Sequence, residues 1–246
     1  SILASGTFSH NTRKRRDEGR KKLNGLSSFV SRLSSFVLRN RLDQIMYDLH
    51  IHSLLSDGCL LPSEIARRYE EKGYQIIAIT DHCDYSNIKA VTEAIIEFTS
   101  HWPKKSSIKV LPGVELTHVP LEQFNPLTKF ARTQGIKIII GHGESPVEPV
   151  GKGTNKAALM ADITILAHPG NITEEDALLA KEKGIFLELT ARRGHCQGNT
   201  HVAKTAKALG INVAINNDAH GPDDILGIDE LKKVAFNAGL SEEEVN

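Results

Sequence analysis

The stretch YDLHIH, residues 47–52, contains the first strong strand signal of this 246-residue chain. A strand is predicted over residues 47–51, and because His50 and His52 lie two residues apart, their side chains are expected to project from the same face. From Met46 onward, short apolar runs alternate with amphipathic helical patterns. Six further strands are predicted, at residues 75–80, 109–116, 136–140, 163–167, 185–189 and 211–215.

Helix signals separate these strands. Helices are predicted to begin at Pro62, Asn87 and Thr173, and near Asn125, Asn155, Asn199 and Asp229. Glycines at positions 73, 135, 184 and 210 end several of them, as the left-handed cap of a helix requires. Thr173 and Asp176 resemble the start of a capping box. Seven strand–helix units of this length predict an α/β protein with a parallel sheet, either a closed barrel or a doubly wound layer.

The two ends of the chain differ in composition from its body. The whole sequence is neutral, with 30 basic and 30 acidic residues, but residues 1–45 contain ten basic residues and only three acidic ones. This Ser- and Arg-rich segment predicts a disordered extension, with an organelle transit peptide or a segment foreign to the natural protein as alternatives. At the other end, Ser241 and Glu244 form a capping box, which predicts a terminal helix that continues beyond Asn246; a frayed polar end is the alternative.

Composition excludes several classes of protein. The acidic body, residues 46–246, makes a nucleic-acid-binding surface a poor interpretation, because binding to phosphates needs clustered basic groups. No apolar run approaches the roughly 18 to 20 residues of a membrane-spanning helix. The three cysteines are far apart and form no Cys-x-x-Cys pair, so we expect neither a disulfide framework nor a zinc finger, and a reducing cytoplasm is the default location.

Ionisable residues cluster where the predicted strands end. In parallel α/β folds the carboxyl ends of the strands gather at one face, so these side chains are expected to converge. Imidazoles and carboxylates without thiolates favour zinc, iron or manganese. The residues in question are His50, His52, Asp81, His82, Glu115, His142, His168, Asp218 and His220.

Six short motifs, taken in order, resemble those of the PHP family, the polymerase and histidinol phosphatase domain. They are DLHIHS at 48–53, TDH at 80–82, GVE at 113–115, IGHG at 140–143, AHPG at 167–170 and DAH at 218–220. The resemblance implies a PHP domain over residues 46–246, with a distorted seven-stranded (β/α) TIM-like barrel and two or three divalent metal ions (Zn²⁺, Mn²⁺ or Fe²⁺).

The resemblance also implies a ligand set. Glu115 would bridge a first metal, shared with His50, His52 and Asp218, and a second metal held by His142 and His168. A third metal would take Asp57, His82 and His220. Among these ligands, Glu115, Asp218 and His220 are the residues we expect to be catalytic.

Closely spaced cations can bridge a water, lower its pKa and stabilise the charge that develops on a phosphoryl group. The sequence therefore predicts hydrolysis of a small phosphomonoester, such as histidinol phosphate. Arg192 and Arg193 are candidate contacts to the substrate phosphate; since adjacent residues of an extended segment point in opposite directions, only one is expected to face the site. His195 is a candidate contact and proton donor, and Lys152 is a weaker one. The sequence has no P-loop and no Gly-x-Ser-x-Gly motif, which disfavours a kinase and a serine hydrolase.

Three alternatives remain open at this point. A nuclease or oligonucleotide phosphatase of the same fold predicts a basic groove. A non-catalytic binding module, like the RNase P subunit that resembles this fold, predicts loss of ligands, whereas all nine positions here hold metal-competent residues. A metal-dependent amidohydrolase would be expected to offer a bridging lysine, whereas Glu115 occupies the third strand. The sequence indicates no membrane partner and does not predict an oligomeric state.

Overall fold

The computed structural model describes residues 46–245, so the interpretation of residues 1–45 lies outside the described residues. The strands are β1 (Tyr47–Asp48), β2 (Ile76–Ile79), β3 (His82–Cys83), β4 (Lys109–Leu116), β5 (Ile138–His142), β6 (Ile165–Ala167), β7 (Phe186–Thr190) and β8 (Val213–Asn216). Seven of them pair in the order β1-β2-β4-β5-β6-β7-β8, all parallel, and β3 pairs with β4. A parallel bridge between Ile51 and Ala219 joins the two ends of this order. The predicted seven-stranded (β/α) barrel is therefore confirmed, in a nearly closed form.

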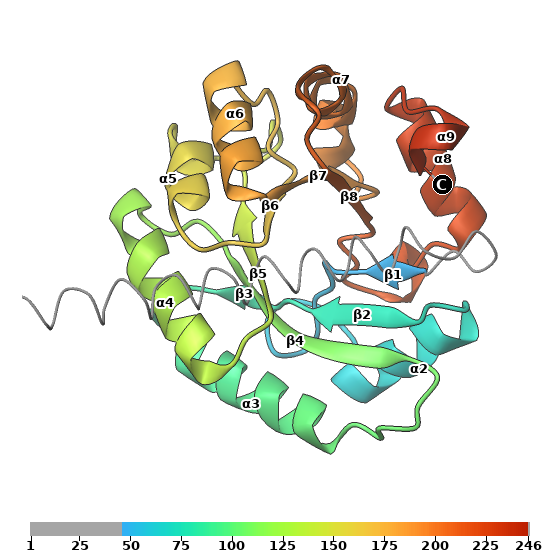
Figure 1. Cartoon of the computed structure of the whole chain (residues 1–246). Helices are drawn as coiled ribbons and strands as arrows, with labels where there is room; N and C mark the ends of the chain where they lie inside the picture. The colour runs from blue at the N-terminus through green and yellow to red at the C-terminus, as the bar shows by residue number, and fades with distance from the viewer. Residues whose placement is uncertain (1–45, 246) are drawn as a thin grey trace, which may run out of the picture. The chain divides into compact units, whose positions relative to one another are not determined.

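Helices follow the strands and lie around the outside of them (Figure 1). They are α2 (Pro62–Glu71), α3 (Ile88–His101), α4 (Phe124–Gln134), α5 (Thr154–Met160), α6 (Glu174–Lys183), α7 (Asn199–Leu209), α8 (Ile228–Asn237) and α9 (Glu242–Val245). The predicted helix starts are confirmed. At α6, the Thr173 hydroxyl accepts a hydrogen bond from the Asp176 backbone at 3.1 Å, and at α9 the Ser241 N–H donates to Glu244 at 2.8 Å.

The first strand is shorter than its sequence predicts. The strand pairing of β1 ends at Asp48 because side chains, rather than a neighbouring strand, accept the next backbone N–H groups. Leu49 donates to Asn216 Oδ1 and Ile51 to Thr80 Oγ1, each at 3.0 Å. These side chains come from the end of β8 and from the residue after β2. Polar groups of the adjacent strands therefore hold in place the segment that carries His50 and His52.

The inside of the barrel has two layers. Eight residues form an apolar cluster there, which we call the interior apolar layer: Leu49, Ala78, Leu111, Ile138, Ile140, Ile165, Ala167 and Ala214. Residues on the other face of the same strands, such as Val114 and Ile139, belong to the larger core packed against the helices. Further along the inward face of the strands the side chains become polar, as at Glu115, His142 and Glu188, all of which are buried. Since residues i, i+2 and i+4 share one face of a strand, each strand carries its inward face from the apolar layer to a polar layer at its carboxyl end.

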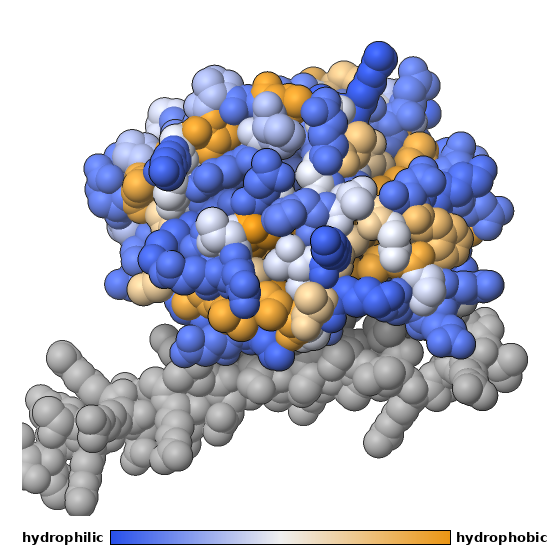
Figure 2. Space-filling view, turned by 90° about the horizontal axis from the view of Figure 1, so that it is seen from above, coloured by the Kyte–Doolittle hydropathy of each residue, from blue (hydrophilic) through white to orange (hydrophobic). Residues whose placement is uncertain are grey.

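The outer surface is mainly polar. In the view of Figure 2, hydrophilic residues predominate and hydrophobic ones form small, separate patches. Within residues 46–245, no helix has the length and apolar character needed to cross a membrane.

Candidate metal centre

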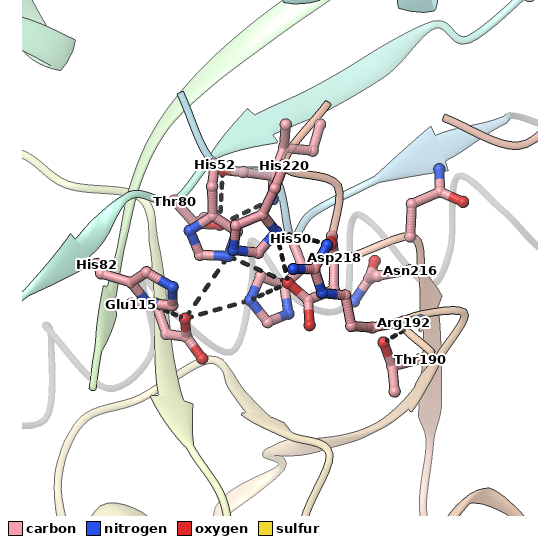
Figure 3. A network of polar contacts seen from close by, with 12 residues as sticks. His50, His52, Thr80, His82, Glu115, Thr190, Arg192, Asn216, Asp218 and His220 are labelled. Carbon is pink, nitrogen blue, oxygen red and sulfur yellow. Dashed lines mark hydrogen bonds and ion pairs between the residues drawn. The ribbon is translucent and has the colours of Figure 1, made fainter. Parts of the chain in front are cut away.

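Nine side chains predicted as ligands meet at the carboxyl end of the barrel, in the polar layer. Figure 3 shows the imidazoles of His50, His52, His82 and His220 turned toward the carboxylates of Glu115 and Asp218. The remaining three, Asp57, His142 and His168, join the same cluster through contacts with these residues or with one another. The strand order thus brings together residues that are up to 170 positions apart in the sequence, counted from His50 to His220.

The group predicted to hold the first metal is compact and fully buried. His50 Nε2 lies 3.4 Å from Glu115 Oε2 and 3.7 Å from Asp218 Oδ1, and His52 Nε2 lies 3.2 Å from Asp218 Oδ1. Donor atoms bound to one zinc ion at about 2.0 to 2.2 Å are themselves about 3 to 3.5 Å apart, so this spacing suits a shared cation. The arrangement therefore supports the predicted ligand set.

Glu188 determines which nitrogen of His50 is free. Its Oε1 lies 2.8 Å from His50 Nδ1, and because a carboxylate accepts, His50 donates through Nδ1, so the neutral form of the ring would present its Nε2 lone pair toward Glu115 and Asp218. Glu188 is held in turn by Asn216 at 2.8 Å and by the backbone N–H of His168 at 3.0 Å. A carboxylate behind a ligating histidine is the usual partner of a metal-bound imidazole. The sequence motifs do not mark Glu188 as a site residue, and this contact makes it a positioning residue.

The group predicted to hold the third metal opens toward the surface. His82 Nε2 lies 3.5 Å from Asp57 Oδ1, and His220 Nε2 lies 3.4 Å from Asp57 Oδ2. The His52 ring packs against those of His82 and His220, at centroid distances of 4.0 and 4.2 Å, and those two rings are themselves 5.7 Å apart. The Asp57 side chain is 58% exposed, so this position is accessible to solvent whereas the first group is not.

The group predicted to hold the second metal contains more residues than the sequence indicates. His142 and His168 pack with ring centroids 4.4 Å apart, and His168 Nε2 lies 3.9 Å from Glu115 Oε1. His195, expected from the sequence as a contact to substrate, lies beside them with its ring 4.3 Å from that of His168. Glu148, which the sequence analysis missed, lies 2.9 Å from His142 Nε2 and 3.3 Å from His195 Nε2. Glu148 sits in the loop between β5 and α5, where no strand-end pattern marks it.

Buried polar atoms without partners test whether cations fit this centre. Among the described residues, eight buried side-chain N and O atoms lack a hydrogen-bond partner: His50 Nε2, both ring nitrogens of His52, both carboxylate oxygens of Glu115, His168 Nδ1, His195 Nδ1 and Asn217 Oδ1. All but the last belong to this cluster. Each unpaired buried polar group lowers the stability of the fold by about 1 to 3 kcal/mol. Seven such groups in one place therefore indicate a missing partner. Divalent cations satisfy several of these atoms at once, and the residues present therefore fit them.

Ionisation in this cluster depends on burial and on the neighbouring charges. Burial lowers the pKa of His52 and of His168 well below the usual value, which keeps both rings neutral, as metal ligation requires. Burial also opposes a charge on His50, but Glu188, Asp218 and Glu115 outweigh it and raise the pKa of that ring. Burial raises the pKa of Asp218 to about 7, and the charge of Glu115 adds to the effect. Although burial disfavours its charge, His50 and His82 lower the pKa of Glu115 well below the usual value, so Asp218 is the carboxylate of this pair whose charge is incompletely compensated without a cation.

The backbone at two ligands adopts an uncommon conformation. His168 and Asp218 have positive φ angles of 26° and 54°, in the region that non-glycine residues seldom occupy. Gly58 allows another close approach, because a Cβ atom there would lie 2.3 Å from the carbonyl oxygen of His52. Such conformations cluster at functional sites, where surrounding contacts hold them in place.

The two candidate arginines occupy different positions. Arg192 is half-buried and donates to Asp224 at 3.2 Å. Burial lowers the pKa of the His195 ring, and the charge of Arg192 lies close enough to contribute to this shift. Asp224 also accepts the backbone N–H of His220 at 2.9 Å, which connects Arg192 to a predicted ligand. Arg193 and Lys152 are exposed.

A pocket of about 370 Å³ borders the cluster on the side of His82. Nine residues line it, and none of them is lysine or arginine: Asp57, His82, Cys83, Asp84, Ser86, Asn87, Thr117, His118 and Glu148. Three carboxylates and two histidines therefore face a space large enough for a small organic group.

Comparisons with known proteins agree with this site. The sequence model of the PHP domain matches residues 48–143. An uncharacterized protein of Methanocaldococcus jannaschii is 42% identical over 204 residues, which cover 81% of this chain and 92% of that protein. A probable phosphatase of Thermoanaerobacter is 28% identical over 81% of this chain and 89% of its own length. The crystal structure of histidinol phosphate phosphatase from Lactococcus lactis, complexed with zinc, L-histidinol and phosphate, shares the fold with a TM-score of 0.57 at 16% identity, covering 80% of this chain and 94% of that one.

Proposed function

This chain belongs to the PHP domain family of metal-dependent phosphoesterases, and from that premise we propose that it hydrolyses a small phosphomonoester. The observation that carries the proposal is the meeting of six histidines and three carboxylates at one end of the barrel, where seven buried N and O atoms, one of them on the neighbouring His195, form no hydrogen bond. Only a site built for cations explains that many unpaired groups in one place.

The ligands divide between three positions. His50, His52 and Asp218 would hold the first cation and His142 and His168 the second, and Glu115, which contacts residues of both groups, would be shared by the two. His82, His220 and Asp57 hold the third. Zinc, manganese or iron at these positions supplies two things to the reaction, a lowered pKa for an attacking water and positive charge for the phosphoryl oxygens.

The chain itself supplies orientation and shielding. Glu188 holds His50 with its Nε2 free, and Asp224 holds the backbone of His220, so ligand geometry is preset by contacts behind the ligands. Complete burial of His50 and Glu115 separates these ligands from bulk solvent. Arg192 is the proposed contact for a substrate phosphate, because its guanidinium lies beside the cluster and matches phosphate oxygens in a planar fork. Arg193 is the second candidate.

The pocket beside His82 supports a small substrate. Its carboxylates, Asp57, Asp84 and Glu148, face the space where the leaving alcohol would lie, and no basic residue lines it. An oligonucleotide would place further phosphates against these charges, which opposes binding. A polar or cationic alcohol fits better, and histidinol phosphate is the first substrate to try.

The test is a hydrolysis screen of small phosphomonoesters and of oligonucleotides, run on one preparation of the full chain whose metal content is measured in parallel. We expect at least two bound metals per chain and faster turnover of monoesters than of oligonucleotides. Faster cleavage of oligonucleotides would assign a nuclease instead. A folded chain that binds no metal and turns over neither class would identify a non-catalytic binding module.

A further inference from the structure

Several side chains outside the nine expected ligands touch the second group, His118 among them, and two of these, His195 and Glu148, have donor atoms suited to a metal. His195 begins the short 3-10 helix η2 (His195–Gly198), and one of its ring nitrogens lies within 4.8 Å of the donor atoms of His142 and His168. Glu148 contacts both His142 and His195 with its carboxylate. The second group therefore contains three histidines and a carboxylate in addition to the bridging Glu115.

His195 has the features of a ligand rather than of a packed histidine. Its side chain is only 10% exposed, and its Nδ1 is buried without a hydrogen-bond partner. A buried imidazole in an ordinary core has its nitrogens paired. The helix η2 is also fixed against the segment that follows His168, because a Cβ atom at Gly198 would lie 3.0 Å from Gly170 Cα. His195 and His168 are therefore held side by side by their backbones.

The contact between Glu148 and His142 points to a cation between them. His142 Nδ1 lies 3.0 Å from the carbonyl oxygen of Gly143 and donates to it, so the neutral ring presents a lone pair at Nε2. That lone pair faces Glu148 Oε2 at 2.9 Å. In the metal-free chain a proton on Nε2 can join these two atoms, and a metal cation bound to both would take its place. His195 Nε2 lies 3.3 Å from the other oxygen of the Glu148 carboxylate. One cation could therefore bind His142, His195 and Glu148 together.

We propose that His195 and Glu148 complete the second metal site, with His195 as a fixed ligand and Glu148 as an exchangeable one. Together with Glu115, His142 and His168 they offer five donors, a number that zinc, iron and manganese accept. Glu148 lies on a loop and its side chain is 33% exposed, so it can leave while the histidines stay. Its departure would free a position for an oxygen of phosphate. The inference rests on the proposed metal-dependent function.

Metal content separates this inference from a role of His195 in contacting substrate alone. The full chain is stripped with a chelator, reloaded with Mn²⁺ or Zn²⁺, and its bound metal and dissociation constants are measured. His195→Gln is expected to weaken the second site at least about tenfold, a change typical of lost metal-site partners. His201→Gln is the matched control, because His201 lies on α7 and bonds to the Ile172 carbonyl, away from the cluster. Unchanged metal binding in a folded His195→Gln protein would overturn the inference.

A thiolate at position 195 provides a direct spectroscopic test, which also covers the case in which His195→Gln folds poorly. His195→Cys loaded with Co²⁺ is expected to show a sulfur-to-cobalt charge-transfer band in the near ultraviolet that the unsubstituted chain and His201→Cys lack. Absence of this band from folded, cobalt-loaded His195→Cys would overturn the inference.

Inorganic phosphate tests the exchangeable ligand. In the metal-loaded protein, Glu148→Gln is expected to bind phosphate several-fold more tightly, since the competing carboxylate is gone, whereas His195→Gln is expected to bind it more weakly. Unchanged or weaker phosphate binding by Glu148→Gln would overturn the exchange. If the unsubstituted chain binds fewer than two metals, the proposed function itself fails; if it binds two and the variants at position 195 match it, only the present inference fails.

Discussion

The two layers inside the barrel are made by the same strands and serve opposite purposes. On β4, Leu111 belongs to the interior apolar layer and Glu115, four residues further along the same face, belongs to the polar layer. The apolar layer has no polar side chain to satisfy, whereas the polar layer leaves seven buried N and O atoms without a protein partner. Burial stabilises the fold in the first layer and opposes it in the second. The free energy gained by burying the apolar layer thus offsets the destabilisation caused by the buried polar layer.

The largest expected effect concerns Glu115→Ala. Because Glu115 is the bridging ligand, its loss should lower kcat/KM for phosphate esters by at least about a thousandfold, equivalent to about 4 kcal/mol. The metal-free protein should unfold at a similar urea concentration, since the ion pairs lost with His50 and His82 are offset by removal of a fully buried carboxylate. Steady-state kinetics, metal analysis and urea unfolding check the three parts. Full turnover with a full complement of metal would contradict the two-metal assignment.

Leu111→Ala, on the same strand, should produce the opposite result. Truncating this buried leucine leaves a cavity and should cost about 3 kcal/mol of unfolding free energy. Activity per folded molecule should change little, because Leu111 lies four residues from the ligand. Urea unfolding and kinetics below the unfolding transition measure both quantities. A large loss of activity with unchanged stability would show that the two layers are not separable in this way.

The difference between the layers also explains what the sequence could predict. Ligands such as His142 and Asp218 come at or directly after strands, so strand order alone predicts that they meet. Glu148 lies in a loop. Its contact with His142 depends on the conformation of that loop, which no periodic sequence pattern predicts. The shortened β1 has a similar cause: Asn216 and Thr80 accept backbone hydrogen bonds in place of a strand, which apolar patterns cannot indicate. Short β3 was missed because only two residues pair.

Glu188→Gln is expected to have an intermediate effect. Glutamine keeps the size of the side chain, but it can turn an N–H group toward His50 Nδ1 and so remove the preference for a free Nε2. Metal affinity at the first site should fall about 10- to 100-fold, as is typical when the partner of a ligating histidine is lost. Titration of the metal-free protein with Zn²⁺ measures this. A variant that binds zinc as tightly as the unsubstituted chain would show that the ligand alone, without its partner, determines the geometry.

The smallest effects are expected for Arg192 and Arg193, which follow β7 and lie beyond both layers. Substituting each in turn compares two neighbouring candidates for the phosphate contact. Arg192→Ala should raise KM for phosphate esters several-fold with little change in kcat, because its guanidinium lies beside the cluster and is held by Asp224. Arg193→Ala should leave KM unchanged, since residues 192–194 form a turn rather than the extended segment expected from the sequence, and the Arg193 side chain is exposed on it. Equal, negligible effects would exclude the phosphate contact. A raised KM only in Arg193→Ala would assign the contact to the other arginine and would mean that Arg192 serves mainly to hold Asp224, and through it the backbone of His220.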